Sequence, residues 1–150
     1  MIQWKEEIII ETNIENVWEL FFDKNIKKIM PKVEEHILIE KKEGEVGAKH
    51  QQKYREGKRV ETYIVETLAY KDSEVEKMKK ISFVLGKAFE INLTFRFLKI
   101  DDTQTKFIYE GRNKGVNFVG RAMLKLGSEK SNQKVVQEFL QKVHQEAMKV

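Results

Sequence analysis

The sequence predicts an α+β fold in which a strongly curved antiparallel sheet of about seven strands wraps around a long C-terminal helix. Three observations lead to this prediction. A β-branched segment opens the chain and is followed by apolar residues at helical spacing. Strand-like runs joined by short turns then occupy residues 32–112, which is typical of an antiparallel meander and not of βαβ units. Residues 116–149 carry a single amphipathic helical stripe, which needs a concave sheet surface to cover it.

Length and composition limit the class of protein. A chain of 150 residues with 41% hydrophobic and 35% charged residues suits one globular domain, which we expect to span 1–150. The absence of cysteine excludes disulfides, thiolate metal sites and cysteine nucleophiles. The net charge of +4 comes from lysines interspersed with acids, so we expect no nucleic-acid interface. We find neither a signal peptide nor a transmembrane segment, and therefore expect a cytoplasmic protein. We expect it to be a monomer or weak dimer.

The first thirty residues predict one strand and two short helices. Residues 2–11 are rich in isoleucine and form the strand. Residues 14–22 form a helix, and residues 24–30 form a second one that Pro31 ends. We assign four aromatic residues of this region to the core: Trp4, Trp18, Phe21 and Phe22. The strand that carries Trp4 can lie at a sheet edge.

Two residues compete to cap the first helix. With Thr12 as the cap, Glu15 stands at capping-box spacing. With Asn13 as the cap, the box is lost but the asparagine side chain caps the helix alone. Either choice leaves Glu15 in the first turn, where the helix dipole favours an acid.

The meander supplies six further strands, followed by the C-terminal helical region. We predict strands over residues 33–42, 47–56, 59–70, 78–85, 88–100 and 103–111. In the fifth of these strands the inner face is apolar and carries Phe89, Ile91, Leu93, Phe95 and Phe97. Helical residues 116–149 would span about 50 Å, so we expect a bend or break at Gly127–Ser128. The helix should pack in the grip of the sheet through Val119, Met123, Leu126, Val136, Leu140 and Val143.

Residues 10–21, with the sequence IETNIENVWELF, resemble the opening signature of the START-like superfamily. This superfamily, also called SRPBCC, includes polyketide cyclase/dehydratase-like proteins and proteins of the birch-pollen-allergen fold. The match is carried by Glu15-Asn16-Val17-Trp18, and the order of elements agrees over essentially the whole chain. The resemblance implies a helix-grip fold with an internal hydrophobic cavity for lipids, sterols, polyketides, quinones or hormones. It implies no catalytic set, because members share the cavity and not its chemistry.

We expect the cavity between the inner face of the sheet and the first half of the last helix. Its predicted ligand-binding residues are His50, Tyr54, Phe83, Phe95, Phe107, Phe118, Met123 and Leu126. Alternation over residues 48–55 points His50, Gln52 and Tyr54 inward, either as a polar wall that orients a ligand or with His50 as an acid–base group. The alternative is a strand near the rim whose polar side chains reach water.

For the strand predicted over residues 59–70, the sequence does not decide which side chains face the interior. Because a bulge moves every later side chain to the opposite face, Tyr63 and Val65 compete with Thr62 and Ile64 for the interior.

No metal or cofactor site is expected. His36 and His144 have no second ligand at metal spacing, and the serines lack a Gly-x-Ser-x-Gly elbow. The glycines of residues 115–122 have the spacing of a phosphate loop but lack its Lys and Ser/Thr. From the sequence alone we therefore expect a chelator to change neither stability nor bound ligand.

These observations favour a small protein that binds a hydrophobic or lipid-like molecule in an internal cavity. One alternative is a cyclase or dehydratase that uses His50 or Tyr54 as an acid–base group in the same cavity. Another is an interaction protein similar to the ribosome-associated or quinone-binding relatives.

Overall fold

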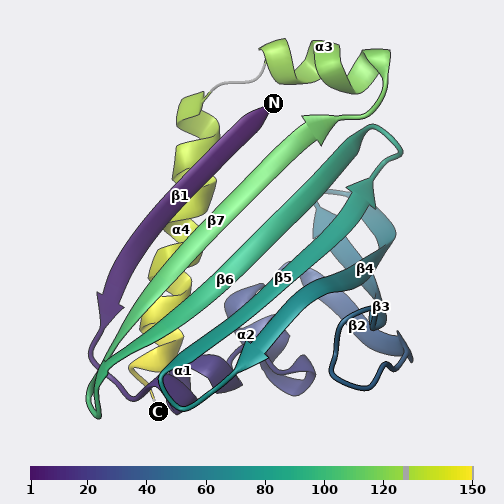
Figure 1. Ribbon diagram of the computed structural model, residues 1–150. Helices are drawn as coiled ribbons and strands as arrows, with labels where there is room; N and C mark the ends of the chain where they lie inside the picture. Colours follow the sequence, from purple (N-terminus) through teal and green to yellow (C-terminus); the bar gives the residue numbers. More distant parts are fainter. Residues whose placement is uncertain (127–128, 150) are drawn as a thin grey trace.

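A seven-stranded antiparallel sheet dominates the computed structural model, which describes residues 1–126 and 129–149 (Figure 1). The strands are β1 (Ile2–Ile10), β2 (Val33–Glu40), β3 (Lys49–Glu56), β4 (Arg59–Asp72), β5 (Glu76–Leu85), β6 (Phe89–Asp101) and β7 (Gln104–Gly115). Their order across the sheet is β1-β7-β6-β5-β4-β3-β2, so β1 and β2 are its edges. The helices are α1 (Ile14–Glu19), the 3₁₀ turn η1 (Asp23–Asn25), α2 (Ile26–Ile29), α3 (Phe118–Leu126) and α4 (Glu129–Ala147).

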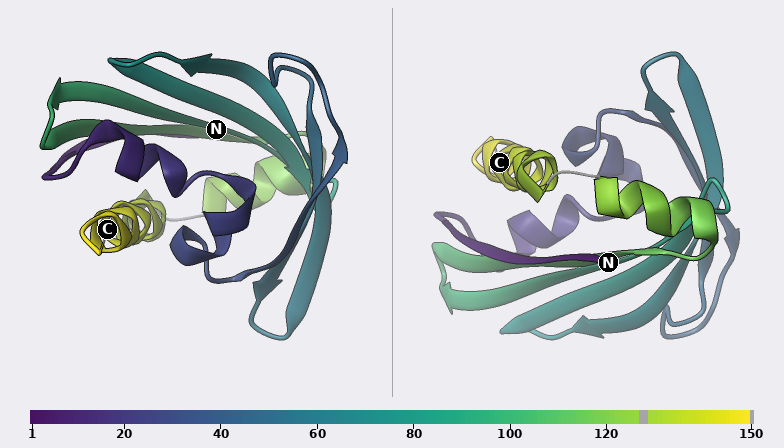
Figure 2. Two further views of the ribbon diagram at one scale, coloured as in Figure 1. Left: turned by 90° about the horizontal axis from the view of Figure 1, so that it is seen from below. Right: turned by 90° about the horizontal axis from the view of Figure 1, so that it is seen from above.

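The sheet curves around α4, and α1 and α2 lie on the same concave side (Figure 2). Consecutive strands from β2 to β7 are neighbours, while β1 crosses to pair with β7. This arrangement confirms the predicted α+β class and the curved meander. No helix in the described part of the chain is long and apolar enough to cross a membrane.

The main difference in strand bounds is in β7, which extends to Gly115 instead of ending at residue 111. Arg112 pairs with Gln3 of β1, and Asn113 pairs with Ile91 of β6. The sequence reasoning ended the strand too early because a polar run before a glycine is also typical of a turn.

Asn13 is the cap of α1, which settles the alternatives left open by the sequence. Its Oδ1 accepts a hydrogen bond of 2.9 Å from the backbone N–H of Glu15, and the Thr12 hydroxyl accepts one from Asn16 instead. The helix ends at Glu19, so Phe22 lies beyond it and is 40% exposed. The assignment of Phe22 to the core is therefore wrong.

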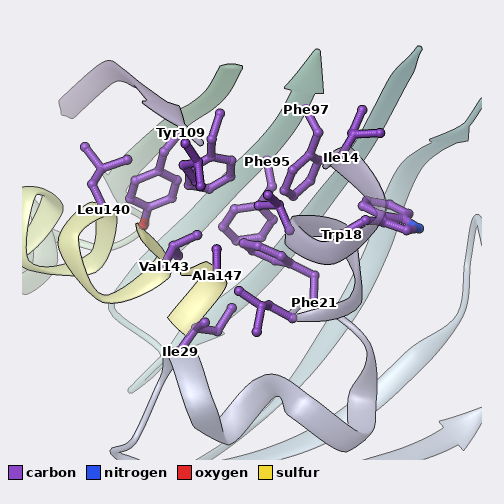
Figure 3. Packing of buried hydrophobic residues seen from close by; sticks show 14 of the residues in the cluster. Ile14, Trp18, Phe21, Ile29, Phe95, Phe97, Tyr109, Leu140, Val143 and Ala147 are labelled. Carbon is purple, nitrogen blue, oxygen red and sulfur yellow. The ribbon is translucent and has the colours of Figure 1, made fainter. Parts of the chain in front are cut away.

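The core is formed by one face of α4 against aromatic residues of the sheet and α1 (Figure 3). Val136, Leu140 and Val143 are all buried on α4, as predicted. The centroid of the Trp18 ring lies 5.2 Å from that of Phe97 in an edge-on contact that anchors α1 to the sheet.

The prediction that the first half of the C-terminal region also packs in the grip is wrong. α3 is a separate helix that lies across the end of the sheet (Figure 1), where Val119 is 60% and Met123 54% exposed. The start of α3 is fixed to the β5–β6 turn, because Asn117 donates a hydrogen bond to the carbonyl of Lys87 at 3.1 Å. The predicted break at Gly127–Ser128 and the side chain of Leu126 lie outside the described residues.

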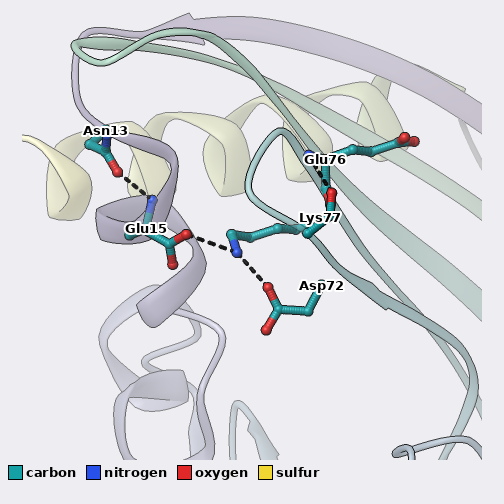
Figure 4. A network of polar contacts seen from close by, with 6 residues as sticks. Asn13, Glu15, Asp72, Glu76 and Lys77 are labelled. Carbon is teal, nitrogen blue, oxygen red and sulfur yellow. Dashed lines mark hydrogen bonds and ion pairs between the residues drawn. The ribbon is translucent and has the colours of Figure 1, made fainter.

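Lys77 of β5 is a buried cation that ties the sheet to α1 (Figure 4). Its ammonium group pairs with the carboxylates of Asp72 and of Glu15, the latter at 3.0 Å, and lies 5.7 Å from the centroid of the Trp18 ring. Burial disfavours the charged form, but the two carboxylates outweigh it and raise the pKa of Lys77.

We expect Lys77→Met to lower the free energy of unfolding by about 1–2 kcal/mol. The loss is limited because Asp72 and Glu15 are both about half exposed and regain water when the cation is removed. Chemical denaturation measures the effect, with Lys71→Met as the matched control, since its pair with Glu76 is screened by solvent and should contribute less than the buried pair. Equal losses in the two variants would contradict the role given to Lys77.

Candidate functional site

A cavity of about 610 Å³ lies between the concave face of the sheet, α2 and α4. Most of its wall is apolar and includes Ile29, Val65, Ile81, Ile91, Leu93 and Val136. This volume lies within the range of small-molecule sites.

Four of the predicted site residues line this cavity: His50, Tyr54, Phe83 and Phe95. Phe107 does not, because it is fully buried in the core, where its ring packs on those of Phe97 and Phe21. The inward direction of Phe107 was predicted correctly, but other rings stand between it and the open space.

The structure does not bring the predicted residues of α3 to the cavity. Phe118 is 80% exposed, and Met123 points away with it. The prediction placed both halves of the C-terminal helical region in the grip of the sheet, whereas α3 lies across its end; the side chain of Leu126 lies outside the described part.

Tyr63 and Val65 occupy the inner face of β4, which resolves the register left open by the sequence. Gln52 pairs with Tyr63 and His50 with Val65 without an interruption, and the bulge comes later, between Thr67 and Ala69. The Tyr63 ring stacks on that of Phe83 with a centroid separation of 4.6 Å.

A carboxylate and two imidazoles meet at one side of the cavity. Nε2 of His50 lies 2.8 Å from Oδ2 of Asp23, and Nε2 of His36 lies 3.0 Å from Oδ1 of the same carboxylate. The two imidazole rings are stacked, with centroids 4.5 Å apart. Hydrogen bonds from His36 and His50 hold the pKa of Asp23 well below its usual range.

Gln52 connects this cluster to the tyrosine on the next strand. Nδ1 of His36 donates to Oε1 of Gln52 at 2.8 Å, and Nε2 of Gln52 donates to the Tyr63 hydroxyl at 2.7 Å. The chain of contacts fixes the orientation of the His36 ring.

Asp23 was not predicted from the sequence as a site residue, and His36 was given no role there. Ligand motifs in a sequence have short spacing along the chain, whereas the antiparallel pairing of β2 with β3 and the position of η1 bring distant residues together here. The expectation that His36 has no second potential ligand beside it is therefore wrong.

Lys79 is a further polar residue of the cavity wall that the sequence analysis did not select. Burial among apolar residues lowers its pKa, against the opposing effect of Asp23. Strand alternation could have found it, because Lys79 shares a face with Ile81 and Phe83.

Trp4 also lines the cavity, although its strand β1 lies at the sheet edge as expected. The indole lies directly over Gly111 of β7, where any Cβ atom would overlap the ring. Glycine at this position lets the tryptophan close one side of the cavity.

Tyr63 predicts a measurable loss of stability at alkaline pH. Burial raises its pKa from 10.0 to about 12, so folding favours the neutral phenol. This contribution to the free energy of unfolding is complete below pH 10 and is lost as the pH rises toward 12. Each pKa unit corresponds to about 1.4 kcal/mol, so the full loss is about 2–3 kcal/mol. Tyr63→Phe should therefore lose less stability than the parent protein between pH 10 and 12 in urea denaturation. Identical losses in the two proteins would contradict the burial of this phenol.

No family model matches the chain, and no curated protein matches it by sequence. Solved structures do match in fold. The Zhui aromatase/cyclase from Streptomyces sp. R1128 superposes with a TM-score of 0.71 at 13% identity, covering 98% of this chain and 93% of that one. Norcoclaurine synthase from Thalictrum flavum, in complex with dopamine and hydroxybenzaldehyde, gives 0.66 at 12% identity, covering 99% and 87%. A conserved protein from Geobacillus kaustophilus gives 0.70 at 15% identity, covering 99% and 96%.

These similarities extend over the whole length of the chain and agree with its observed topology. They confirm the fold that the residues around Trp18 had indicated. The chain has the helix-grip fold of the START-like proteins.

Proposed function

We propose that this protein binds an amphipathic small molecule whose hydrophobic body fills the cavity. The observation that carries the proposal is the cavity itself, about 610 Å³ with a mostly apolar wall. Apolar surface of this extent gains free energy when a hydrophobic ligand displaces water from it.

Several polar groups of the cavity wall come from the neighbouring strands β3, β4 and β5, and they define the second half of the ligand. His50, Gln52, Tyr63 and Lys79 present donors and acceptors there. A purely hydrocarbon ligand would offer no partner to the Lys79 ammonium or to the hydrogen of the Tyr63 hydroxyl, at a cost in free energy. A molecule with a hydroxyl, carbonyl or acidic group at one end fits better. The dopamine and hydroxybenzaldehyde bound by norcoclaurine synthase show that this fold accommodates such aromatic molecules.

The Asp23–His50 contact favours a second function, that of an enzyme acting on the bound molecule. A carboxylate that contacts one ring nitrogen orients a histidine for proton transfer by the other. Loss of turnover in His50→Ala with retained ligand affinity would support the enzyme, whereas loss of affinity without any turnover in the parent would support the binding protein.

Binding is tested by titrating the protein with 1-anilinonaphthalene-8-sulfonate, a fluorophore with apolar rings and an anionic group. We expect saturable enhancement of its fluorescence with one site per chain.

The exposed apolar side chains of α3 could also attract this fluorophore, so Phe118→Ser is the control. It should leave saturable binding unchanged, because Phe118 lies outside the cavity wall. Enhancement that disappears in Phe118→Ser, or that never saturates, would contradict the proposed site.

A further inference from the structure

We propose that Asp23, His36 and His50 form a binding site for one divalent transition-metal ion, with Zn²⁺ the ion best suited to it. The three side chains come from η1, β2 and β3 and offer one carboxylate and two imidazole ligands. Their ligand atoms all lie within 4.8 Å of one another.

The donor set matches the chemistry of such an ion. Two histidines and one carboxylate bind zinc in sites that keep a coordination position free, and related sets bind iron, cobalt and nickel. Bonds of 2.0–2.2 Å place neighbouring ligand atoms of a tetrahedral site about 3.3 Å apart. The two imidazole nitrogens contact different oxygens of Asp23, at 3.0 and 2.8 Å, and the three ligand atoms lie within 4.8 Å of one another, so the side chains must move together to reach that spacing.

Gln52 orients the His36 ring in the way that a metal ligand requires. Because Nδ1 of His36 donates its hydrogen to Oε1 of Gln52, Nε2 is the nitrogen left to bind an ion, which would replace the hydrogen that Nε2 donates to Asp23. This is the nitrogen that faces Asp23. Gln52 is itself held by the Tyr63 hydroxyl, so the orientation does not depend on an exposed group.

The surroundings provide both access and a free coordination position. The Asp23 side chain is 46% exposed, so an ion can enter from solvent, whereas the two histidine side chains are less than a tenth exposed. Both histidines line the cavity, and a bound ion would therefore present its open position to an oxygen of the cavity ligand.

The test is isothermal titration calorimetry of chelator-treated protein with Zn²⁺, repeated with Co²⁺ for its visible absorption. We expect one ion per chain. Asp23→Asn, His36→Ala and His50→Ala should each weaken binding at least tenfold, and Gln52→Leu should weaken it about 10- to 100-fold. Zn²⁺ should also raise the thermal midpoint of the parent but not of the Asp23→Asn protein.

His144→Ala is the matched control, because His144 is an exposed histidine on α4. It should bind Zn²⁺ as the parent does. Absence of binding in the parent, or equal affinity in Asp23→Asn and the parent, would overturn the site. Asparagine has nearly the shape of aspartate, so the Asp23→Asn protein should fold, and its loss of binding would not be due to unfolding. The titration contains no organic ligand, so its failure would leave the proposed cavity function standing.

Discussion

Leu140→Ala should lower the free energy of unfolding by about 2–5 kcal/mol. Leu140 is 1% exposed, and α4 holds it among the buried residues of the core between the helix and the sheet. Removing three carbons there loses apolar burial and opens a void that the surrounding aromatic rings cannot readily fill. Urea denaturation monitored by circular dichroism measures the loss.

The matched control is Val135→Ala, on the same helix but 64% exposed. It should change the free energy of unfolding by less than about 0.5 kcal/mol, as surface substitutions usually do. A Leu140→Ala protein as stable as this control would contradict the packing of α4 in the grip of the sheet.

Ile81→Trp should weaken binding of 1-anilinonaphthalene-8-sulfonate by about 100-fold or more, equivalent to about 2.7 kcal/mol. Ile81 points from β5 into the cavity, so the larger indole occupies space that the probe needs. Because the new side chain enters open volume and not a close-packed core, the fold should survive. Fluorescence titration measures the affinity, and circular dichroism checks the fold.

Two further variants separate filling of the cavity from the effect of an added indole. Val84→Trp places the same side chain on the same strand, but Val84 is 48% exposed and outside the cavity wall. Met123→Trp places it on α3, which the sequence had assigned to the cavity and the structure does not. Both should bind the probe like the parent; loss of binding in either one would place the probe elsewhere.

The fold was predictable because its signals are local and repeated. The capped helix that carries Trp18, the alternation in β6 and the short turns between strands each indicate one local structure, and they agree with one another. The error at α3 came from the same reasoning, since an amphipathic stripe does not say which surface it faces. Here Gly120 lies against the carbonyl of Ala88, a contact between distant segments that directs the helix across the sheet end.

The candidate site was predictable only in part. Strand alternation placed His50 and Tyr54 at the cavity, because the side that each side chain of a strand faces can be read from the sequence of that strand alone. The partners Asp23 and His36 depend on the pairing of β2 with β3 and on the position of η1, which no spacing along the chain reveals. Tyr63 needed the register of β4, which a single bulge decides.

Isoleucine-methyl NMR during titration with 1-anilinonaphthalene-8-sulfonate tests most directly that the cavity is the binding site. The aromatic rings of the probe should shift the methyl signals of Ile29, Ile81 and Ile91, whose side chains line the cavity. The signals of Ile37 and Ile100, which are exposed and lie outside it, should stay in place. Shifts confined to the exposed isoleucines, or no shifts under saturating probe, would contradict a ligand-binding cavity.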